Sequence, residues 1–341
     1  MRKLVTIQRV SAIKPIEGAD AIELAQVMGW QCVVKKHEFK EGDLGVYFEV
    51  DSFLPVEERY EFLRKSSYRE SPYNGMGFRI KTVKLRGQLS QGLFLSLSQF
   101  PDLQQTPPVA VGEDLTELLK VKKWEIPETT GFGGTSLGGR AHGIPTSDEI
   151  RIQSAPELIE QLKGKPYYIT TKLDGTSGTV YFIDGKVGCC SRSREIKEEP
   201  IALYWQPVFK YGLREKLAEY GKRIVLIGEI CGPGIQKNRL KLSEPDWFIF
   251  DVIDWSNGGP EYMALHNALA VCDSLGLKMV PIEENCNSLP FNYTLEELLE
   301  KAKGKYPSGQ DKEGIVVRDY YNPKQISFKV INNDFLLKDK D

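Results

Sequence analysis

Hydrophobic and polar residues alternate in short runs over roughly the first third of the chain. Gly, Pro and Asp residues, which favour turns, separate these runs. The runs read LVTIQRVSAI, IELAQVMGWQCVVKK, DLGVYFEVDSFL, GFRIKTVKLRGQ and QGLFLSLSQF. Alternation with period two predicts strands, so residues 1 to about 120 should form a small β-barrel or sandwich, an OB-like barrel being one option. The run DLTELLKVKKW predicts an added helix.

From residue 150 onward the hydrophobic pattern mixes two periods. Apolar residues three and four positions apart predict helices over APELIEQLKGK, VFKYGLREKLAEYGKR, ALHNALAVCDSLGL and TLEELLEKAKGK. Continuous or alternating apolar runs predict strands over RIVLIGEI, WFIFDVI, EGIVVRDYY and QISFKVI. The predicted fold class is therefore α+β, with a largely antiparallel sheet in this part.

Glycine is concentrated between the two patterns, in PETTGFGGTSLGGRAHGIPTSDE over residues 127–149. This composition is typical of a flexible linker, and it also fits a mobile loop over a site. The linker interpretation predicts a first domain over 1–125, a linker over 126–145 and a second domain over 146–341.

Charged residues recur at the ends or in the middle of strands predicted for the second domain. Lys172 ends the β-rich run YYITT and precedes an Asp-Gly turn, and Glu229 ends an apolar strand. Glu313 and Arg318 bracket a third strand, and Lys329 lies within a fourth. A buried charge is costly unless it is paired or used. Charged residues contributed by four strands of one sheet can together form a site that binds phosphate and a metal ion.

Each of these residues alone also fits a structural role. Cross-strand ion pairs would account for Glu313 and Arg318, and an exposed edge strand for Lys329. The aromatic Phe250, beside Asp251, would fit ordinary core packing. The joint order of the motifs around these residues decides between the interpretations.

Six short motifs, KLDG, SRSRE, IGEI, FIFDV, EGIVVR and SFKVIN, follow one another over residues 172–332. Their order resembles that of the covalent nucleotidyltransferases, which include ATP-dependent DNA ligases, RNA ligases and GTP-dependent mRNA capping enzymes. The resemblance implies a nucleotidyltransferase (ATP-grasp-like ligase) domain with antiparallel sheets and flanking helices.

The domain layout narrows the resemblance to one branch. DNA ligases and capping enzymes carry an OB domain after the last motif, whereas about a dozen residues follow Lys329 here. A barrel before the motifs, with Arg151 in SDEIRIQS, is similar to RNA ligases that have an N-terminal OB-like domain and seal 3′-OH and 5′-phosphate ends. A DNA ligase, a capping-type guanylyltransferase and a catalytically silent nucleic-acid-binding protein remain alternatives.

The resemblance implies that Lys172 is the nucleophile that attacks ATP and forms lysyl-AMP. A divalent cation, Mg²⁺ or Mn²⁺, close to the amine would favour its neutral form. The resemblance makes Asp174, Glu229 and Glu313 the carboxylates that hold this ion, through water. Asp174 or Glu229 could instead contact the ribose.

The same resemblance implies roles in ATP binding for other residues. Phe250 would stack on adenine with Val316 on the opposite face, and Arg192 would bind ribose or phosphate. Arg151 and Lys329 would bind the phosphates. The last of the six motifs, SFKVIN here, often carries a second lysine in this family, whereas Ser327 occupies that position in this chain and Lys324 could substitute. The remaining nucleotide contacts are expected from Thr171 and Gly175.

The formal net charge of −2 gives no global basic field that would indicate nucleic acid, although a local basic surface is compatible with it. The layout predicts that the N-terminal domain holds the RNA, with free ends or a nicked duplex as substrate. Ordinary solvated strand faces are the alternative interpretation of its basic residues. The candidate RNA contacts are Lys35, Lys36, Arg79, Lys81, Lys84 and Arg86.

Cysteine spacing and hydropathy predict the cellular setting. The six cysteines include no C-x-x-C pair, which favours reduced thiols in an intracellular protein, cytoplasmic or nuclear. The first residues, MRKLVTIQRV, contain no apolar leader segment, and no apolar run approaches the roughly 20 residues of a membrane span. We expect a monomer with no membrane partner.

Overall fold

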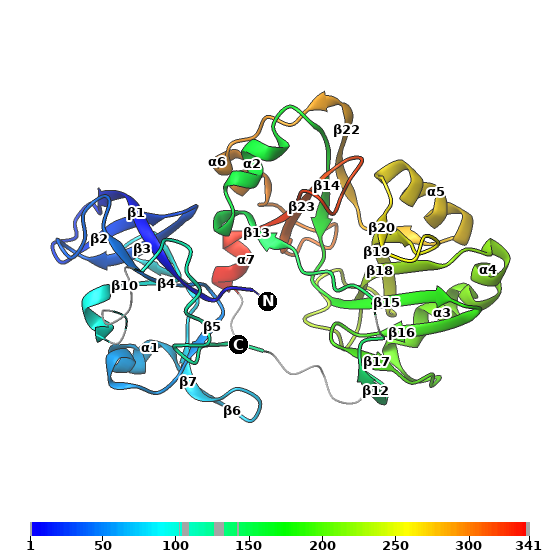
Figure 1. The fold of residues 1–341 in the computed structure, drawn as a ribbon, viewed down its shortest axis with the longest axis horizontal. Coiled ribbons are helices and arrows are strands. Elements are labelled where there is room, and N and C mark those ends of the chain that lie inside the picture. Colours follow the sequence, from blue (N-terminus) through cyan, green and yellow to red (C-terminus); the bar gives the residue numbers. More distant parts are fainter. Residues whose placement is uncertain (1, 102, 104–108, 126–132, 142, 339–341) are drawn as a thin grey trace. The chain divides into compact units, whose positions relative to one another are not determined.

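The computed structural model describes residues 2–101, 103, 109–125, 133–141 and 143–338 (Figure 1). These residues divide into two compact units, which we describe separately. The first unit contains the described residues of 1–127 together with Gln153–Pro156, and the second those of 128–152 and Glu157–Lys338. The 3-10 turn η4 (Ile152–Ser154) falls where the chain passes between these ranges. The domain boundaries named above stay predictions.

The first unit is built around a five-stranded antiparallel sheet in the order β10-β4-β1-β2-β3. The first half of β1 pairs with β4 and the second half with β2, and a bulge between Val10 and Ala12 bends the strand between them. A second sheet has the order β11-β5-β7-β6, and β8 and β9 form a separate hairpin. The elements are β1 (Val5–Pro15), β2 (Ile22–Val27), β3 (Trp30–Lys35), β4 (Leu44–Phe48), β5 (Ser52–Leu54), η1 (Glu58–Leu63), α1 (Arg64–Ser67), β6 (Tyr68–Ser71), β7 (Gly75–Arg79), β8 (Thr82–Leu85), β9 (Gln88–Gln91), β10 (Leu93–Ser96), η2 (Leu97–Gln99) and β11 (Lys122–Lys123).

The helix predicted over DLTELLKVKKW is wrong, because residues 116–120 form turns and β11 follows them. Both ends of this segment are bonded to strands. The backbone N–H of Leu115 donates to the carbonyl of Val5, and Lys122 pairs with Phe53 of β5. Burial of Leu115 and Val121 in the core of the unit therefore overrides helix propensity.

The second unit contains an eight-stranded sheet and a five-stranded sheet. The eight-stranded sheet runs β12-β17-β16-β15-β18-β19-β20, with β21 beside β19, and the five-stranded sheet runs β13-β24-β23-β14-β22. All pairs are antiparallel except β13 with β24 and β19 with β21. The strands are β12 (Ser136–Gly139), β13 (Ile150–Arg151), β14 (Pro166–Lys172), β15 (Thr176–Ile183), β16 (Lys186–Cys190), β17 (Arg194–Ile196), β18 (Ile224–Cys231), β19 (Asp246–Asp254), β20 (Glu261–Tyr262), β21 (Lys278–Met279), β22 (Ile282–Pro290), β23 (Gly314–Asp319) and β24 (Ser327–Ile331).

Helices flank both sheets of this unit. They are α2 (Glu157–Leu162), η5 (Leu203–Trp205), α3 (Gln206–Tyr211), α4 (Leu213–Tyr220), α5 (Leu265–Leu275), α6 (Leu295–Lys301) and α7 (Asn333–Lys338). The single helix predicted over VFKYGLREKLAEYGKR is split into α3 and α4, because Gly212 takes a left-handed conformation with φ of 60°. No described helix is both long enough and apolar enough to cross a membrane.

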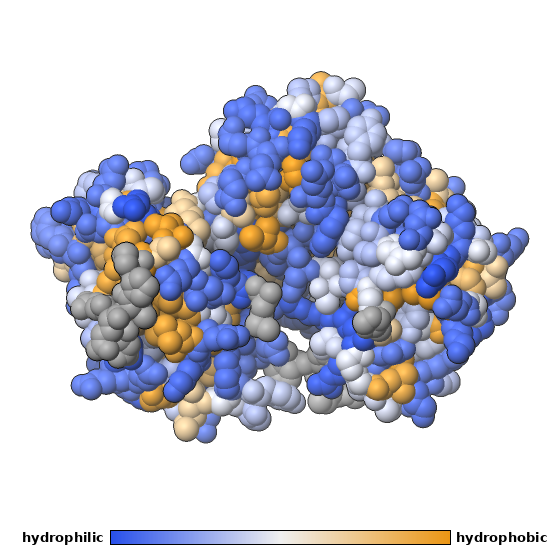
Figure 2. Space-filling view, viewed as in Figure 1, coloured by the Kyte–Doolittle hydropathy of each residue, from blue (hydrophilic) through white to orange (hydrophobic). Residues whose placement is uncertain are grey.

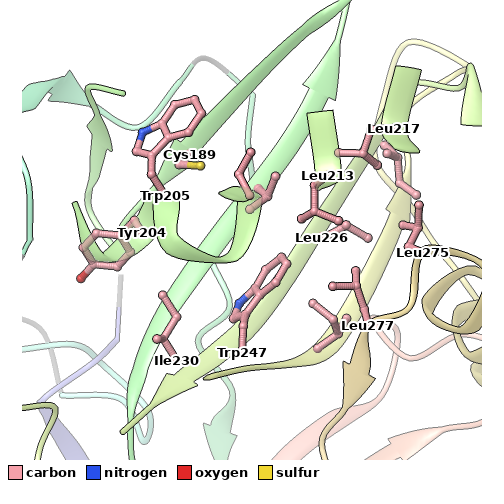
Figure 3. Packing of buried hydrophobic residues seen from close by; sticks show 14 of the residues in the cluster. Cys189, Tyr204, Trp205, Leu213, Leu217, Leu226, Ile230, Trp247, Leu275 and Leu277 are labelled. Atoms are coloured by element: carbon pink, nitrogen blue, oxygen red, sulfur yellow. The ribbon is translucent and has the colours of Figure 1, made fainter. Parts of the chain in front are cut away.

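Strand β18 shows how side-chain alternation separates core from site. Leu226 and Ile230 pack with Leu213 of α4 and with Trp247 in the helix-covered core (Figure 3). Val225 and the next odd-numbered residues point to the opposite face of the sheet. Glu229 therefore lies on the face away from these helices.

Part of the predicted glycine-rich linker is ordered in the second unit. Ser136–Gly139 forms β12 and pairs with β17. The Arg140 side chain donates hydrogen bonds to the carbonyl of Ser191 and to the hydroxyl of Thr179, at 3.1 Å for the latter. Residues 126–132 of the predicted linker lie outside the described residues.

On the face in Figure 2, hydrophilic residues cover most of the surface and hydrophobic residues form separate patches.

Candidate active site

A row of cross-strand neighbours places several predicted site residues on one face of the five-stranded sheet. Arg151 of β13 pairs with Lys329 of β24, Lys329 pairs with Val316 of β23, and Val316 pairs with Thr170 of β14. Directly paired residues share a face, and residues two apart on a strand also share it. Lys172 therefore projects from the same face as Arg151, Val316 and Lys329.

Lys172 ends β14 opposite Gly314, where the ladder with β23 stops. Its Nζ donates a hydrogen bond of 2.7 Å to Oε2 of Glu313, the residue just before β23. The side chains are 24% and 19% exposed, so this ion pair is mostly shielded and still reachable from solvent. The two charged residues on separate predicted strands are thus brought together.

The Tyr306 hydroxyl links the two backbone segments that carry this pair. It donates to the carbonyl of Lys172 at 2.8 Å and accepts from the N–H of Glu313 at 3.1 Å. Its ring is buried beside Leu173 and Val280. Sequence reasoning missed Tyr306, because its spacing to the motifs carries no recognisable signal.

Two further carboxylates complete the surroundings of Lys172. Oε1 of Glu229 accepts the N–H of Gly175 at 3.1 Å, within the turn that follows Lys172. Oδ2 of Asp174 accepts from Nε of Arg239 at 2.7 Å, and both of these side chains are at most 15% exposed. Arg239, also missed from sequence, lies in the loop between β18 and β19.

Electrostatic interactions couple these groups. Burial opposes the charge of Lys172, but Glu313, Glu229 and Asp174 outweigh it and raise the pKa of the amine. Burial raises the pKa of Glu229 to about 7, with Glu313 adding to the rise and Lys172 opposing it. Burial and Glu313 also raise the pKa of Asp174. Three carboxylates therefore surround two cations, Lys172 and Arg239.

The donor chemistry fits a divalent cation held through water. Within the described ranges, no three His, Cys, Asp or Glu side chains are grouped so as to hold a metal ion directly. Mg²⁺ usually keeps several waters and binds through few carboxylates. Burial, with repulsion from Glu313 added, raises the carboxyl pKa values of Glu229 and Asp174, and added positive charge would oppose this rise.

A bulge in β19 brings Phe250 to the same site. Ile227 of β18 pairs with Asp251 of β19, but the next residue, Gly228, pairs with Ile249. Phe250 is therefore the additional residue of a β-bulge in β19. The guanidinium of Arg318 lies 5.8 Å from the centre of the Phe250 ring. Phe250 is half-buried, so part of its ring is accessible, unlike that of a core residue.

Arg318 is the centre of a buried charge network beside this ring. Its Nη2 lies 3.1 Å from Oε1 of Glu149 and 3.8 Å from Oδ1 of Asp251. Burial and Glu149 raise the pKa of Asp251 to about 6 against the opposing effect of Arg318. The network joins the FIFDV and EGIVVR motifs to the SDEIR segment, and the sequence did not point to Glu149.

Two predicted ATP contacts have other partners. The Thr171 side chain lies on the opposite face from Lys172, where its hydroxyl donates to Glu283 at 2.8 Å, and Lys312 donates to the same carboxylate at 2.7 Å. Strand alternation directs this side chain away from the nucleophile, and the ATP contact of Thr171 stays a prediction. Arg192 forms an exposed ion pair with Asp148.

The predicted RNA contacts of the first unit divide into two groups. Lys35, Lys36, Lys84 and Arg86 are exposed, and Lys81 is half-buried. Arg79 differs from the others: it is buried, pairs with Asp51 at 3.5 Å, and its guanidinium lies 4.9 Å from the centre of the Trp124 ring, while its RNA contact stays a prediction. Arg79 therefore packs inside the unit, and sequence alternation could not indicate its aromatic partner.

Comparisons with known proteins agree with this geometry. A family model described as an OB-fold domain matches residues 4–97, and the RNA ligase family model matches residues 165–331. No curated protein matches the chain.

Solved structures of Naegleria gruberi RNA ligase are similar over the whole chain. A variant with ATP and Mn is 38% identical, with a TM-score of 0.91 and 98% of each chain covered. A second variant with ATP and Mn is 38% identical, with a TM-score of 0.92 and 100% of each chain covered. The same enzyme with PPi gives a TM-score of 0.90 at 38% identity, with 98% of each chain covered.

Fold and site thus define a nucleotidyltransferase with an N-terminal OB-fold domain. The chain belongs to the RNA ligase family. The predicted family, the α+β fold with an OB-like barrel, and the enzyme class are confirmed.

Proposed function

We propose that the chain is an ATP-dependent RNA ligase that joins 3′-OH and 5′-phosphate ends through lysyl-AMP and AMP-RNA intermediates. The observation that carries the proposal is the half-shielded Lys172–Glu313 pair at 2.7 Å, surrounded by Glu229 and Asp174. The similar Naegleria gruberi structures with ATP, AMP and Mn support the choice of ATP and of Mg²⁺ or Mn²⁺.

In the first step, Nζ of Lys172 attacks the α-phosphorus of ATP, the bond to the pyrophosphate oxygen breaks, and the amine loses a proton. Amines attack only when neutral, and the surrounding carboxylates hold Lys172 protonated. A divalent cation held through water by Asp174, Glu229 and Glu313 would favour the neutral amine and offset negative charge on the phosphate. Tyr306 keeps the Lys172 and Glu313 backbones in register during this step.

The other site residues position ATP. The accessible ring of Phe250 stacks on adenine, and Val316 covers the opposite face. Arg151 and Lys329, on the Lys172 face of the sheet, bind phosphate oxygens and stabilise charge as the pyrophosphate leaves. Arg192 leaves its ion pair with Asp148 and binds the ribose or a phosphate of ATP instead. Thr171 and Gly175 contribute through backbone groups beside the nucleophile.

In the later steps, AMP moves to the RNA. The 5′-phosphate oxygen attacks the lysyl-AMP phosphorus and frees Lys172, and the 3′-OH then attacks the 5′-phosphate and releases AMP. These steps define the substrate as RNA with a 3′-OH and a 5′-phosphate, either as free ends or in a nicked duplex. The protein acts as a monomer in this proposal.

Labelled nucleotides test the proposal. The protein is incubated with Mg²⁺ or Mn²⁺ and ATP or GTP labelled at the α-phosphate, and is then analysed on a denaturing gel. We expect labelled protein with ATP alone, and sealing of nicked RNA with a 5′-phosphate but not with a 5′-OH. Labelling by GTP would support a capping-type enzyme, and the absence of any label would support a silent nucleic-acid-binding protein.

A further inference from the structure

The β8–β9 hairpin is a separate ribbon in the first unit. Its strands pair from Thr82 with Gln91 to Leu85 with Gln88, and neither pairs with the two larger sheets. Arg86 and Gly87 connect the strands with φ angles of 46° and 81°, the positive values that a tight type I′ turn requires.

The base of the ribbon is fixed to the barrel. The Ser90 hydroxyl accepts the N–H of Val33 at 3.0 Å, and the side chain of Gln31 donates to the carbonyl of Leu89 at 2.9 Å. The hydroxyl of Tyr47 donates to the carbonyl of Gln91 at 3.1 Å. A two-stranded ribbon is marginally stable alone, so these bonds hold its direction while residues 83–88 remain exposed.

The exposed part of the ribbon is apolar on one face and basic elsewhere. Val83 and Leu85, both 43% exposed, share one face, Lys84 points to the other, and Arg86 occupies the turn. Residues 80–91 contain three basic side chains and no acidic one, in a chain of net charge −2. The ribbon is therefore a local positive patch with uncovered apolar surface.

Duplex RNA matches this combination of groups. Its wide, shallow minor groove exposes riboses and 2′-hydroxyls between two rows of phosphates. Cations bind the phosphates by releasing condensed counterions, and apolar side chains can pack on the ribose carbons between them. A partner protein would need a strongly acidic surface to match the exposed Lys84 and Arg86.

We propose that the β8–β9 ribbon binds the RNA duplex, with Lys84 and Arg86 on phosphates and Val83 and Leu85 against the riboses. This inference rests on the proposed ligase function and assigns the place where its substrate is held. The two kinds of contact predict different responses to salt, because only the charged contacts release counterions.

Binding of a fluorescent nicked RNA duplex to the full-length protein, without ATP, tests the inference across a salt series. In the K84A/R86A variant, the slope of log affinity against log salt should become shallower by about 1.8, since each phosphate contact contributes about 0.9. In the V83S/L85S variant, affinity should fall severalfold at every salt concentration, with the slope of the wild type. The exposed pair K186A/K222A in the second unit serves as a charge-matched control and should bind like the wild type.

Each outcome decides the assignment once thermal unfolding shows that the variants are folded. Wild-type affinity and slope in K84A/R86A would overturn the proposal. A change in self-association of V83S/L85S, with unchanged RNA binding, would assign the ribbon to a second copy of the chain instead. If wild-type protein fails to become labelled by ATP, the ligase function itself fails, which is a separate result from loss of binding by the ribbon variants.

Discussion

The Lys172 cluster and the β8–β9 ribbon use charge in opposite ways. At the cluster, a lysine meets a glutamate 141 positions away in the sequence, at a 2.7 Å contact that only the fold creates. On the ribbon, basic residues lie within a few positions of one another and stay exposed. This contrast fits the two proposals, in which the cluster forms a covalent bond to AMP and the ribbon binds a polyanion.

The largest expected effect is that of Lys172→Ala. Because the substitution removes the attacking amine, covalent labelling by ATP should fall to background. Because the Lys172 side chain is partly exposed, the substitution should leave the protein folded, which thermal unfolding checks. Lys186→Ala, an exposed lysine on β16, is the control and should be labelled like the wild type. A labelled Lys172→Ala protein would place the nucleophile elsewhere.

Glu313→Gln should slow labelling by two or more orders of magnitude. The substitution keeps the shape but removes the charge 2.7 Å from Lys172, and with it one of the three carboxylates that would hold the cation. Single-turnover labelling at limiting Mg²⁺ measures the effect. The matched change Glu284→Gln, at a carboxylate that pairs with Lys301, should leave the rate unchanged. Wild-type rates in Glu313→Gln would contradict the proposed role.

Glu229→Gln should stabilise the protein at alkaline pH. The pKa of Glu229 is about 7 in the folded protein, above the ordinary glutamate value of 4.5. A raised pKa means that stability present at low pH is lost as pH rises through 7. Glutamine cannot ionise and still accepts the Gly175 N–H, so it should raise the free energy of unfolding at pH 8 by up to about 3 kcal/mol, at about 1.36 kcal/mol per pKa unit. Chemical denaturation at pH 5 and pH 8 checks this; an equal effect at both values would contradict the burial of this charge.

Phe250→Ala should weaken ATP binding by about 1–3 kcal/mol, the range for stacking of a base on an aromatic ring. Phe250→Leu should lose less, because an apolar contact remains. Titration with ATP measures both affinities. If both variants bind ATP normally but unfold at lower temperature, Phe250 is a packing residue and the adenine assignment fails.

Tyr306→Phe should have the smallest effect, about tenfold on the rate of labelling, which corresponds to about 1.4 kcal/mol. The ring still fills its site, but the bridge between the carbonyl of Lys172 and the N–H of Glu313 is lost. We expect the ATP concentration at half-maximal rate to stay unchanged, because Tyr306 fixes the reacting groups rather than the nucleotide. Tyr293→Phe, which removes a hydroxyl bonded to Glu284, controls for hydroxyl loss outside the site.

Sequence reasoning could predict the residues whose signal is local. Lys172 ends β14 and Glu229 lies two residues before the end of β18, both inside recognisable motifs, and strand alternation alone places Glu229 on the face away from the helices. Thr171 is next to the nucleophile in the sequence, but strand alternation turns its side chain toward Glu283 on the opposite face. Closeness to a motif therefore does not place a side chain in the site.

Tyr306, Arg239 and Arg79 depend on tertiary contacts that leave no pattern in the sequence. Tyr306 bonds to backbone groups of Lys172 and Glu313, and Arg239 reaches Asp174 from a loop. Arg79 follows the same alternation as an exposed strand arginine, and only packing against Trp124 distinguishes it. The helix predicted near Leu115 failed for the same reason, since its hydrogen bond to Val5 is a long-range contact.

The most direct test of the account is to locate AMP on the protein. Wild-type protein would be incubated with ATP and Mg²⁺ or Mn²⁺ without RNA, digested, and analysed by mass spectrometry. The account predicts a single AMP-bearing peptide with the modification on Lys172, which disappears when nicked RNA with a 5′-phosphate is added. AMP on another residue, or an adduct on Lys172 that persists while RNA is sealed, would contradict it.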